Sequence, residues 1–149
     1  MRILVDADAC PVRTIIVREA RNRKVPVLLI CDTSHRLEDG YSQVFTVDKG
    51  ADSADLKLMA LAQPGDIIVT QDYGVAAMAL GKGLRALNQN GLVYTADNID
   101  QLLFERVLGK KVRRSGGRTQ TMKKRRPEED RAFESVLRRL MEEAYGSDQ

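Results

Sequence analysis

Short apolar runs alternate with amphipathic segments along most of the chain. Apolar runs that end in polar residues predict buried strands, and they occur at residues 3–5, 25–31, 44–47, 66–70 and 84–87. A further run at 92–95 would pair with the fifth across residues 88–91, where Asn-Gly is a hairpin signal. Segments that suit helices lie at residues 12–22, 53–62, 73–80, 97–109 and 127–149.

Strands that alternate with helices predict a mostly parallel sheet, because parallel neighbours need a crossover between them. The sequence therefore predicts an α/β protein with about five strands in a three-layer α/β/α arrangement. A chain of 149 residues has the size of one domain. We divide it into an α/β domain at residues 1–109, a basic loop at 110–126 and a C-terminal helix at 127–149 that packs on the same domain.

The charge is unevenly distributed along the chain. The net charge of +3 combines a slightly acidic body, with 12 Lys and Arg against 14 Asp and Glu in residues 1–109, and a basic tail, with 12 against 7 in residues 110–149. The expected loop at 110–126 holds nine basic and no acidic residues. Such a loop suits contacts with nucleic-acid phosphates, which add affinity without sequence choice. The alternative is a solvated loop with no such role.

Acidic residues follow the predicted strands. The first strand ends in Asp6 and Asp8, and the fourth is followed by Asp72. Further carboxylates near the same edge are Asp48, Asp52 and Asp55. Ligands of parallel α/β sheets bind at the carboxyl ends of the strands. These acids therefore predict either a cluster that holds a hard cation such as Mg²⁺ or Mn²⁺ or a set of separate helix caps.

Four segments carry a resemblance to a known family. They are VDADACPV at residues 5–12, KGADSAD at 49–55, VTQD at 69–72, and NID at 98–100 followed by Leu102, Leu103 and Arg106. This set resembles the YaiI/YqxD family of small bacterial proteins, over nearly the whole chain. That family is functionally uncharacterised and is similar to the PIN-like nuclease superfamily, whose sheet gathers acids around Mg²⁺ or Mn²⁺.

The resemblance also indicates individual positions. Thr70 matches a small hydroxyl residue ahead of the last acid, and the acidic motif positions match Asp6, Asp8, Asp52, Asp55 and Asp72. The tail departs from the family pattern, which has Gly-Pro ahead of an aromatic residue where this chain has TMKKRRP at 121–127. This departure concerns the role of the loop and leaves the acidic site unaffected.

We therefore expect a Mg²⁺- or Mn²⁺-dependent nuclease that hydrolyses phosphodiester bonds, with RNA favoured over DNA as substrate. The expected catalytic residues are Asp6, Asp8, Thr70 and Asp72, and the expected metal ligands are Asp6, Asp8, Asp48, Asp52, Asp55 and Asp72. The expected phosphate contacts are Arg113, Arg114, Arg118, Lys123 and Lys124. Thr70 either binds a phosphate oxygen, orients the attacking water or bonds to the backbone.

Two other functional classes share the strand-end acids. A haloacid-dehalogenase-like phosphatase would use Asp6 as a nucleophile and Asp8 as an acid or base, although Cys10 replaces its usual Thr or Val. A phospho-acceptor of the receiver type would need a Lys where the chain has Asn88 and Gln89. The non-enzymatic alternative is an RNA-binding module with a residual metal site, and the few aromatic residues argue against sequence-specific binding of single strands.

The remaining expectations concern the protein's surroundings. Two cysteines are too few for a disulfide framework, and the N-terminus leads directly into a strand, so we expect a reducing cytoplasm. No apolar run approaches the ~20 residues that a membrane span requires. The single histidine, His35, lies in an expected loop and is left out of the mechanism. The sequence leaves open whether the chain forms a homodimer.

Overall fold

The computed structural model describes residues 1–8, 10–32, 37–49, 53–114 and 124–147. These residues form a five-stranded, all-parallel sheet with the strand order β3-β2-β1-β4-β5. The strands are β1 (Ile3–Asp6), β2 (Val27–Asp32), β3 (Gln43–Val47), β4 (Ile67–Val69) and β5 (Arg85–Leu87). The helices are α1 (Arg13–Asn22), α2 (Ser53–Leu61), α3 (Tyr73–Gly81), α4 (Ala96–Arg114) and α5 (Pro127–Ser147). The expected α/β class and three-layer arrangement are confirmed.

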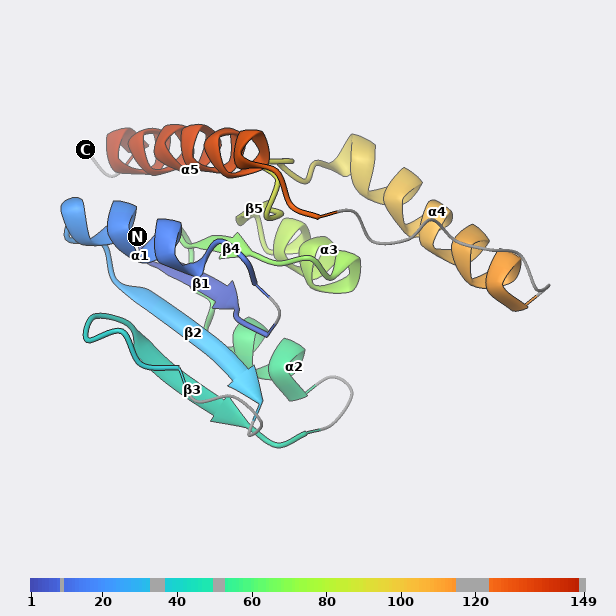
Figure 1. Cartoon of the computed structure of the whole chain (residues 1–149), viewed down its shortest axis with the longest axis horizontal. Helices are drawn as coiled ribbons and strands as arrows, with labels where there is room; N and C mark the ends of the chain where they lie inside the picture. Colours follow the sequence, from blue (N-terminus) through green and yellow to red (C-terminus); the bar gives the residue numbers. More distant parts are fainter. Residues whose placement is uncertain (9, 33–36, 50–52, 115–123, 148–149) are drawn as a thin grey trace.

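Side chains of the central strand enter two separate cores. Ile3 and Val5 of β1 belong to a core that includes Phe133 of α5, whereas Leu4 belongs to a core that includes Leu58 of α2. This alternation follows from the two-residue period of a strand. Helices α1 and α5 therefore cover one face, and α2 and α3 cover the other (Figure 1). A strand covered on both faces is apolar throughout, which explains the unbroken apolar run of β1.

The strand order reverses its direction between β1 and β4. From β1 the chain moves outward to β2 and β3, and it then returns through α2 to β4 on the other side of β1. At such a switch point the helices on either side lie on opposite faces, and a crevice opens outside the carboxyl ends of the two strands. The fold therefore places the residues that follow β1 and β4 at the usual ligand position of an open α/β sheet.

The expected strand at 92–95 did not form as a regular element. Only an antiparallel bridge between Leu87 and Val93 extends the turn. The physical reason is a helix cap directly after it: the Asn98 side chain accepts a hydrogen bond from the Thr95 amide at 2.9 Å, and the Asn98 amide donates to the Thr95 hydroxyl at 3.1 Å. This cap begins α4 and ends the hairpin.

The turn itself was expected and forms around Gly91. Gly91 has a φ of 85°, which favours glycine. A Cβ at this position would lie 2.9 Å from the Ala132 carbonyl oxygen of α5. Glycine therefore satisfies both the turn and the close approach of the C-terminal helix.

The boundary of the basic loop was wrong at its start. Helix α4 does not end at Gly109 but runs to Arg114 and projects from the body of the protein (Figure 1). Glycine in a helix costs only about 1 kcal/mol, and lysines and arginines near the C-terminus interact favourably with the helix dipole. Residues 115–123 lie outside the described part of the chain. In the part that is described, no helix has the length and apolar character needed to cross a membrane.

Helix α5 is attached to α1 by ion pairs around a buried acid. Glu19 of α1 is only 1% exposed. Arg138 of α5 donates to both of its carboxylate oxygens, with distances of 2.8 and 3.0 Å, and Arg23 donates to Oε2 at 2.8 Å. At the start of α5, Arg125 donates to Asp130 at 2.6 Å and to Asn90 at 2.8 Å. The C-terminal helix therefore packs on the α/β domain, through contacts on α1 and on the turn after β5.

Candidate functional site

A cleft of about 420 Å³ lies at the carboxyl ends of β1 and β4. Asp6 and Asp8 line it from the end of β1, and Asp72 lines it from the start of α3. The remaining lining residues are Gln71, Tyr73 and Arg106. The cleft thus coincides with the switch point of the sheet, and three of the predicted catalytic residues border it.

Thr70 is hydrogen-bonded to both Asp6, at the end of β1, and Asp72, which follows β4. Its hydroxyl donates a hydrogen bond to Asp6 Oδ2 at 3.2 Å and accepts one from the Asp72 amide at 3.0 Å. Its carbonyl accepts a hydrogen bond from the Tyr94 hydroxyl at 3.0 Å. Thr70 is only 1% exposed. Its hydroxyl is therefore engaged within the protein and orients Asp6 relative to the start of α3.

The other two acids are held by backbone amides. Asp8 accepts a hydrogen bond from the Asp32 amide, with Oδ2 at 3.1 Å. Asp72 caps α3, because its Oδ1 accepts hydrogen bonds from the amides of Gly74 at 2.7 Å and Val75 at 3.2 Å. Capping therefore accounts for part of the Asp72 geometry. It does not account for Asp6 and Asp8, because α1 is capped by Val12 without a side-chain hydrogen bond.

The cleft concentrates negative charge around Asp6. The pKa of Asp6 is raised from 3.8 to about 6, mainly by burial; the Thr70 hydrogen bond partly opposes this rise, and the charges of Asp55, Asp8 and Asp72 add to it. Desolvation and like charges both disfavour an ionised carboxylate. Ionisation of Asp6 is therefore opposed by burial and by the neighbouring carboxylates, and a bound cation would offset this negative charge.

The donors of the cleft fit a hard cation, since Mg²⁺ and Mn²⁺ prefer carboxylate oxygens. Asp6, Asp8 and Asp72 are the residues that could hold one. Among the described residues, no group of three or more acidic, His or Cys side chains is already arranged closely enough to do so. Asp72 Oδ1 and Asp8 Oδ2 accept hydrogen bonds from backbone amides, which hold these carboxylates in place and leave further lone pairs for a cation.

The other predicted ligands are distributed differently. Asp55 lies in the first turn of α2, and its charge acts on Asp6, although it does not line the cleft. Asp48 is exposed and follows β3, which is separated from β1 by β2. Asp52 lies outside the described residues, as does the loop residue His35, which was not among the predicted ligands. The structure thus brings Asp6, Asp8 and Asp72 together, with Asp55 nearby, and leaves Asp48 apart.

The predicted phosphate contacts are described only in part. Arg113 and Arg114 belong to the last turn of α4, where the side chains are outside the described part of the chain, and Arg118 and Lys123 lie outside it altogether. Lys124 is exposed ahead of α5. Their role as a nucleic-acid surface stays a prediction.

Sequence reasoning assigned no chemical role to Arg106. Its Nη1 lies 3.9 Å from Asp72 Oδ1, and its side chain is 46% exposed. A signal was present in the sequence: Ile99, Leu102 and Leu103 form the inward face of α4, and Arg106 continues that face at helical spacing. A cation on the apolar face of a helix indicates an anionic partner on the other side.

Comparisons with known proteins agree with the resemblance of the motifs. The model of a family described as "Uncharacterized BCR, YaiI/YqxD family" matches residues 4–143. A UPF0178 protein of Ruminiclostridium cellulolyticum is 64% identical over 137 residues, which cover 92% of this chain and 90% of the relative. One of Clostridium acetobutylicum is 50% identical over 95% of this chain and 97% of its own length.

No solved structure matches the chain. The family match extends over both strand-end motifs and the cleft residue Arg106, and the relatives align along nearly their whole length. The chain therefore belongs to the YaiI/YqxD family.

Proposed function

We propose that the protein is a Mg²⁺- or Mn²⁺-dependent phosphodiesterase that cleaves RNA. The observation that carries this proposal is the convergence of Asp6, Asp8 and Asp72 in one cleft at the switch point of the sheet, with Arg106 beside them. Carboxylates gathered in one cleft are electrostatically unfavourable unless a cation joins them. Without that cation the carboxylates would repel a phosphate group from the cleft, whereas other parts of a polynucleotide could still bind outside it.

Each residue of the cleft has a specific task in this proposal. Asp6, Asp8 and Asp72 would hold the ion through carboxylate oxygens. Such an ion, when bound, lowers the pKa of a water and offsets negative charge on the phosphate. Thr70 is a positioning residue, because its buried hydroxyl donates to Asp6 and fixes the carboxylate against the start of α3.

Arg106 would contact the phosphate that enters the cleft. Its present contact with Asp72 is long, at 3.9 Å, and the side chain is half-exposed, so little energy opposes its movement. A guanidinium group binds phosphate oxygens in pairs. Without an ion, Arg106 would therefore offset only part of the negative charge, that of Asp72, and it would contact the substrate once the ion neutralises the carboxylates.

The choice of RNA as substrate rests on the expected similarity of the family to PIN-like nucleases and on the basic segment. Positive residues at the end of α4 and at Lys124 would add phosphate contacts outside the cleft. Such contacts favour a polynucleotide over a small phosphate ester. They supply affinity without sequence choice.

The test is cleavage of a labelled single-stranded RNA in Mn²⁺ and in Mg²⁺. Asp6→Asn and Asp72→Asn should each reduce the rate by about 10³-fold or more, since each removes a ligand charge. Asp100→Asn is the matched control, because Asp100 is an exposed acid of α4 outside the cleft. It should cleave within about twofold of the wild-type rate.

The same experiment separates the alternatives. A phosphatase with Asp6 as nucleophile would gain one phosphate on Asp6 from a small phosphoryl donor, which mass spectrometry would detect. A binding module would neither cleave RNA nor form this adduct, and its RNA affinity would be indifferent to both substitutions. Cleavage that persists in Asp6→Asn and Asp72→Asn would contradict the proposed function.

A further inference from the structure

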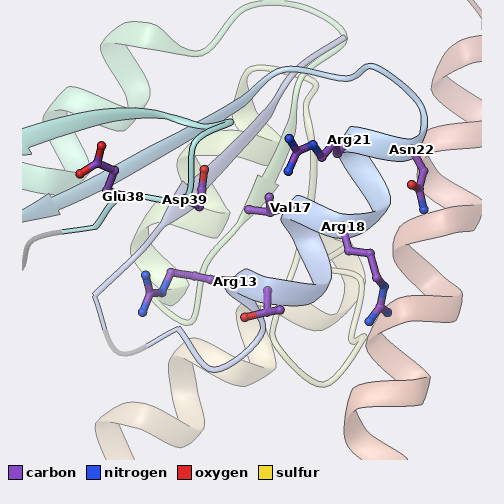
Figure 2. A pocket seen from close by; sticks show the side chains of 8 residues that line it. Arg13, Val17, Arg18, Arg21, Asn22, Glu38 and Asp39 are labelled. Carbon is purple, nitrogen blue, oxygen red and sulfur yellow. The ribbon is translucent and has the colours of Figure 1, made fainter.

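A second cavity lies between α1 and the segment that leads into β3. Its volume is about 460 Å³. Arg13, Val17 and Arg21 line it from successive turns of α1, and Glu38 and Asp39 line it from the opposite segment (Figure 2). We call this cavity the α1 pocket. It is separate from the cleft described above, with which it shares no lining residue.

Two arginines of the α1 pocket are available to a ligand. The Nε of Arg13 is buried and has no hydrogen-bond partner among the described residues. The guanidinium of Arg21 lies 5.8 Å from the centre of the Tyr41 ring, and no acid among the described residues forms an ion pair with it. Arg18 is different, because its side chain turns toward α5 and lies 3.0 Å from Glu134 (Figure 2). A buried donor without a partner is costly, and an anionic ligand would satisfy it.

The opposite wall carries hydrogen-bond acceptors. Asp39 accepts hydrogen bonds from the amides of Tyr41 at 2.8 Å and Ser42 at 2.7 Å. Burial alone would raise its pKa, but these hydrogen bonds and the charge of Arg13 lower it. Asp39 is therefore ionised and committed to the local turn. Glu38 is exposed beside it, and its carboxylate can accept hydrogen bonds from a ligand.

Cations on one wall and an acceptor on the other suit a nucleotide. A nucleotide combines an anionic phosphate with a base whose exocyclic amino group, in adenine, cytosine and guanine, donates hydrogen bonds. A simple anion would use only the arginines. The spacing also favours a chain over a small ligand, because Arg13 and Arg21 are eight residues apart and lie about 12 Å apart along the helix axis.

A short stretch of chain leads from Asp8 of the carboxylate cleft to Arg13 of the α1 pocket. Arg13 is five residues beyond Asp8, so their Cα atoms are at most about 18 Å apart. A strand of a few nucleotides spans such a distance. A substrate in the cleft can therefore extend past Arg13 and along α1.

We propose that the α1 pocket is a subsite for a nucleotide of the RNA strand whose scissile phosphodiester lies in the carboxylate cleft. Arg13 and Arg21 bind phosphates of that strand, and Glu38 accepts a hydrogen bond from the amino group of a base. This assignment rests on the proposed function for the identity of the strand. The pocket itself is defined by its own residues and can be tested without cleavage.

The first test measures binding of fluorescent single-stranded RNA by anisotropy in EDTA, which prevents metal-dependent cleavage. Arg13→Gln/Arg21→Gln should weaken binding about tenfold and reduce the slope of log affinity against log salt by about 1.4, since two phosphate contacts to a single strand are lost. Arg131→Gln/Arg139→Gln removes the same charge from α5, where these arginines pair with Glu128 and Glu143. It should weaken binding less than twofold. Equal weakening by both double variants would overturn the proposal.

A second measurement, protection from chemical modification, uses the unchanged protein and so does not depend on the folding of a variant. RNA should protect Arg13 and Arg21, but not Arg131, from modification by phenylglyoxal, as read by mass spectrometry. Oligo(C) should bind several-fold more tightly than oligo(U), and Glu38→Gln should reduce this difference, because uracil lacks an exocyclic amino group. Modification of Arg13 and Arg21 that RNA does not slow would contradict the subsite.

Failure of this subsite and failure of the proposed function give different results. If Arg13→Gln/Arg21→Gln cleaves RNA with the wild-type KM, the subsite is wrong and the phosphodiesterase stands. If the double variant loses RNA binding selectively while no form of the protein cleaves RNA in Mn²⁺ or Mg²⁺, the pocket is an RNA site and the phosphodiesterase is wrong.

Discussion

Asp6 and Glu19 are two poorly exposed carboxylates whose pKa values are shifted in opposite directions. Burial and neighbouring acids raise the pKa of Asp6 to about 6. Hydrogen bonds from Arg138, assisted by Arg23, lower the pKa of Glu19 to about 2. Among the described residues, the hydrogen-bond donor to the Asp6 carboxylate is a neutral hydroxyl, that of Thr70. The two acids therefore differ in whether the chain itself supplies the compensating charge.

The difference separates a structural acid from a candidate functional one. Glu19 binds arginines of its own chain and thereby attaches α5 to α1. Asp6 lies among Asp8, Asp55 and Asp72, and Arg106, which lines the same cleft, contacts Asp72 at 3.9 Å. A carboxylate that the protein leaves uncompensated in a cleft is typical of a binding site. The predictions below test this comparison.

The largest expected effect is stabilisation by a divalent cation. Mn²⁺ or Mg²⁺ at a hundred times its Kd should add about 2.7 kcal/mol to the free energy of unfolding by mass action, which corresponds to about 5–10 °C in Tm. Differential scanning fluorimetry with Ca²⁺-free buffers measures this shift. Glu19→Gln should keep the shift and Asp6→Asn should lose most of it, and an identical shift in both variants would remove the cleft as its origin.

Removal of the structural acid should cost somewhat less. Glu19→Gln should lower the free energy of unfolding by about 2 kcal/mol at pH 7, because charge-assisted hydrogen bonds become neutral while the half-exposed arginines regain water. The folded pKa of Glu19 is depressed, so its contribution is complete above about pH 4.5 and is lost as the pH falls toward 2. Urea unfolding between pH 3 and 7 should show the deficit shrinking at low pH. A pH-independent deficit would mean that packing, not charge, is responsible.

Neutralisation of the candidate functional acid, Asp6, should change the free energy of unfolding in the opposite direction. Asp6→Asn should raise the stability of the metal-free protein by about 1 kcal/mol at pH 8, because it removes a carboxylate whose ionisation the cleft opposes. The folded pKa of Asp6 is raised above its unfolded value, so the free energy of unfolding of the wild type falls as Asp6 ionises between about pH 4 and about pH 6. The gain should therefore vanish below pH 4 in chelator-containing urea titrations. A destabilised Asp6→Asn at pH 8 would show that the Thr70 hydrogen bond outweighs the repulsion.

The smallest stability effect is expected at Arg106. Its contact with Asp72 is long and solvent-exposed, so Arg106→Gln should change the free energy of unfolding by less than about 0.5 kcal/mol. RNA cleavage should nevertheless fall by one to two orders of magnitude if Arg106 contacts the phosphate, and Arg106→Lys should restore only part of it. A loss of stability with unchanged cleavage would mean that Arg106, like Arg138, has a structural role and does not contact the substrate.

Most of the secondary structure could be predicted because its signals are local. The apolar run of β1 ends at its carboxylates, and Pro127 with three acids behind it marks the start of α5. The errors occurred where two local signals competed. The Thr95–Asn98 cap ended the expected strand early, and the basic residues after Gly109 continued α4 beyond the glycine.

The sequence by itself determined that acids follow the strands, since parallel strands carry their C-terminal residues to a common edge. Only the tertiary structure decided which acids meet. The order β3-β2-β1-β4-β5 makes β1 and β4 neighbours, so Asp6 and Asp72 share a cleft although they are far apart in the chain, whereas Asp48 follows a strand that β2 separates from β1. Arg106 reaches the cleft, and Glu38 lines the same pocket as Arg13, through packing that no local pattern encodes. The hydrophobic periodicity of a segment indicates which of its side chains are buried. The partner of each polar group depends instead on how segments that are distant in the sequence pack together.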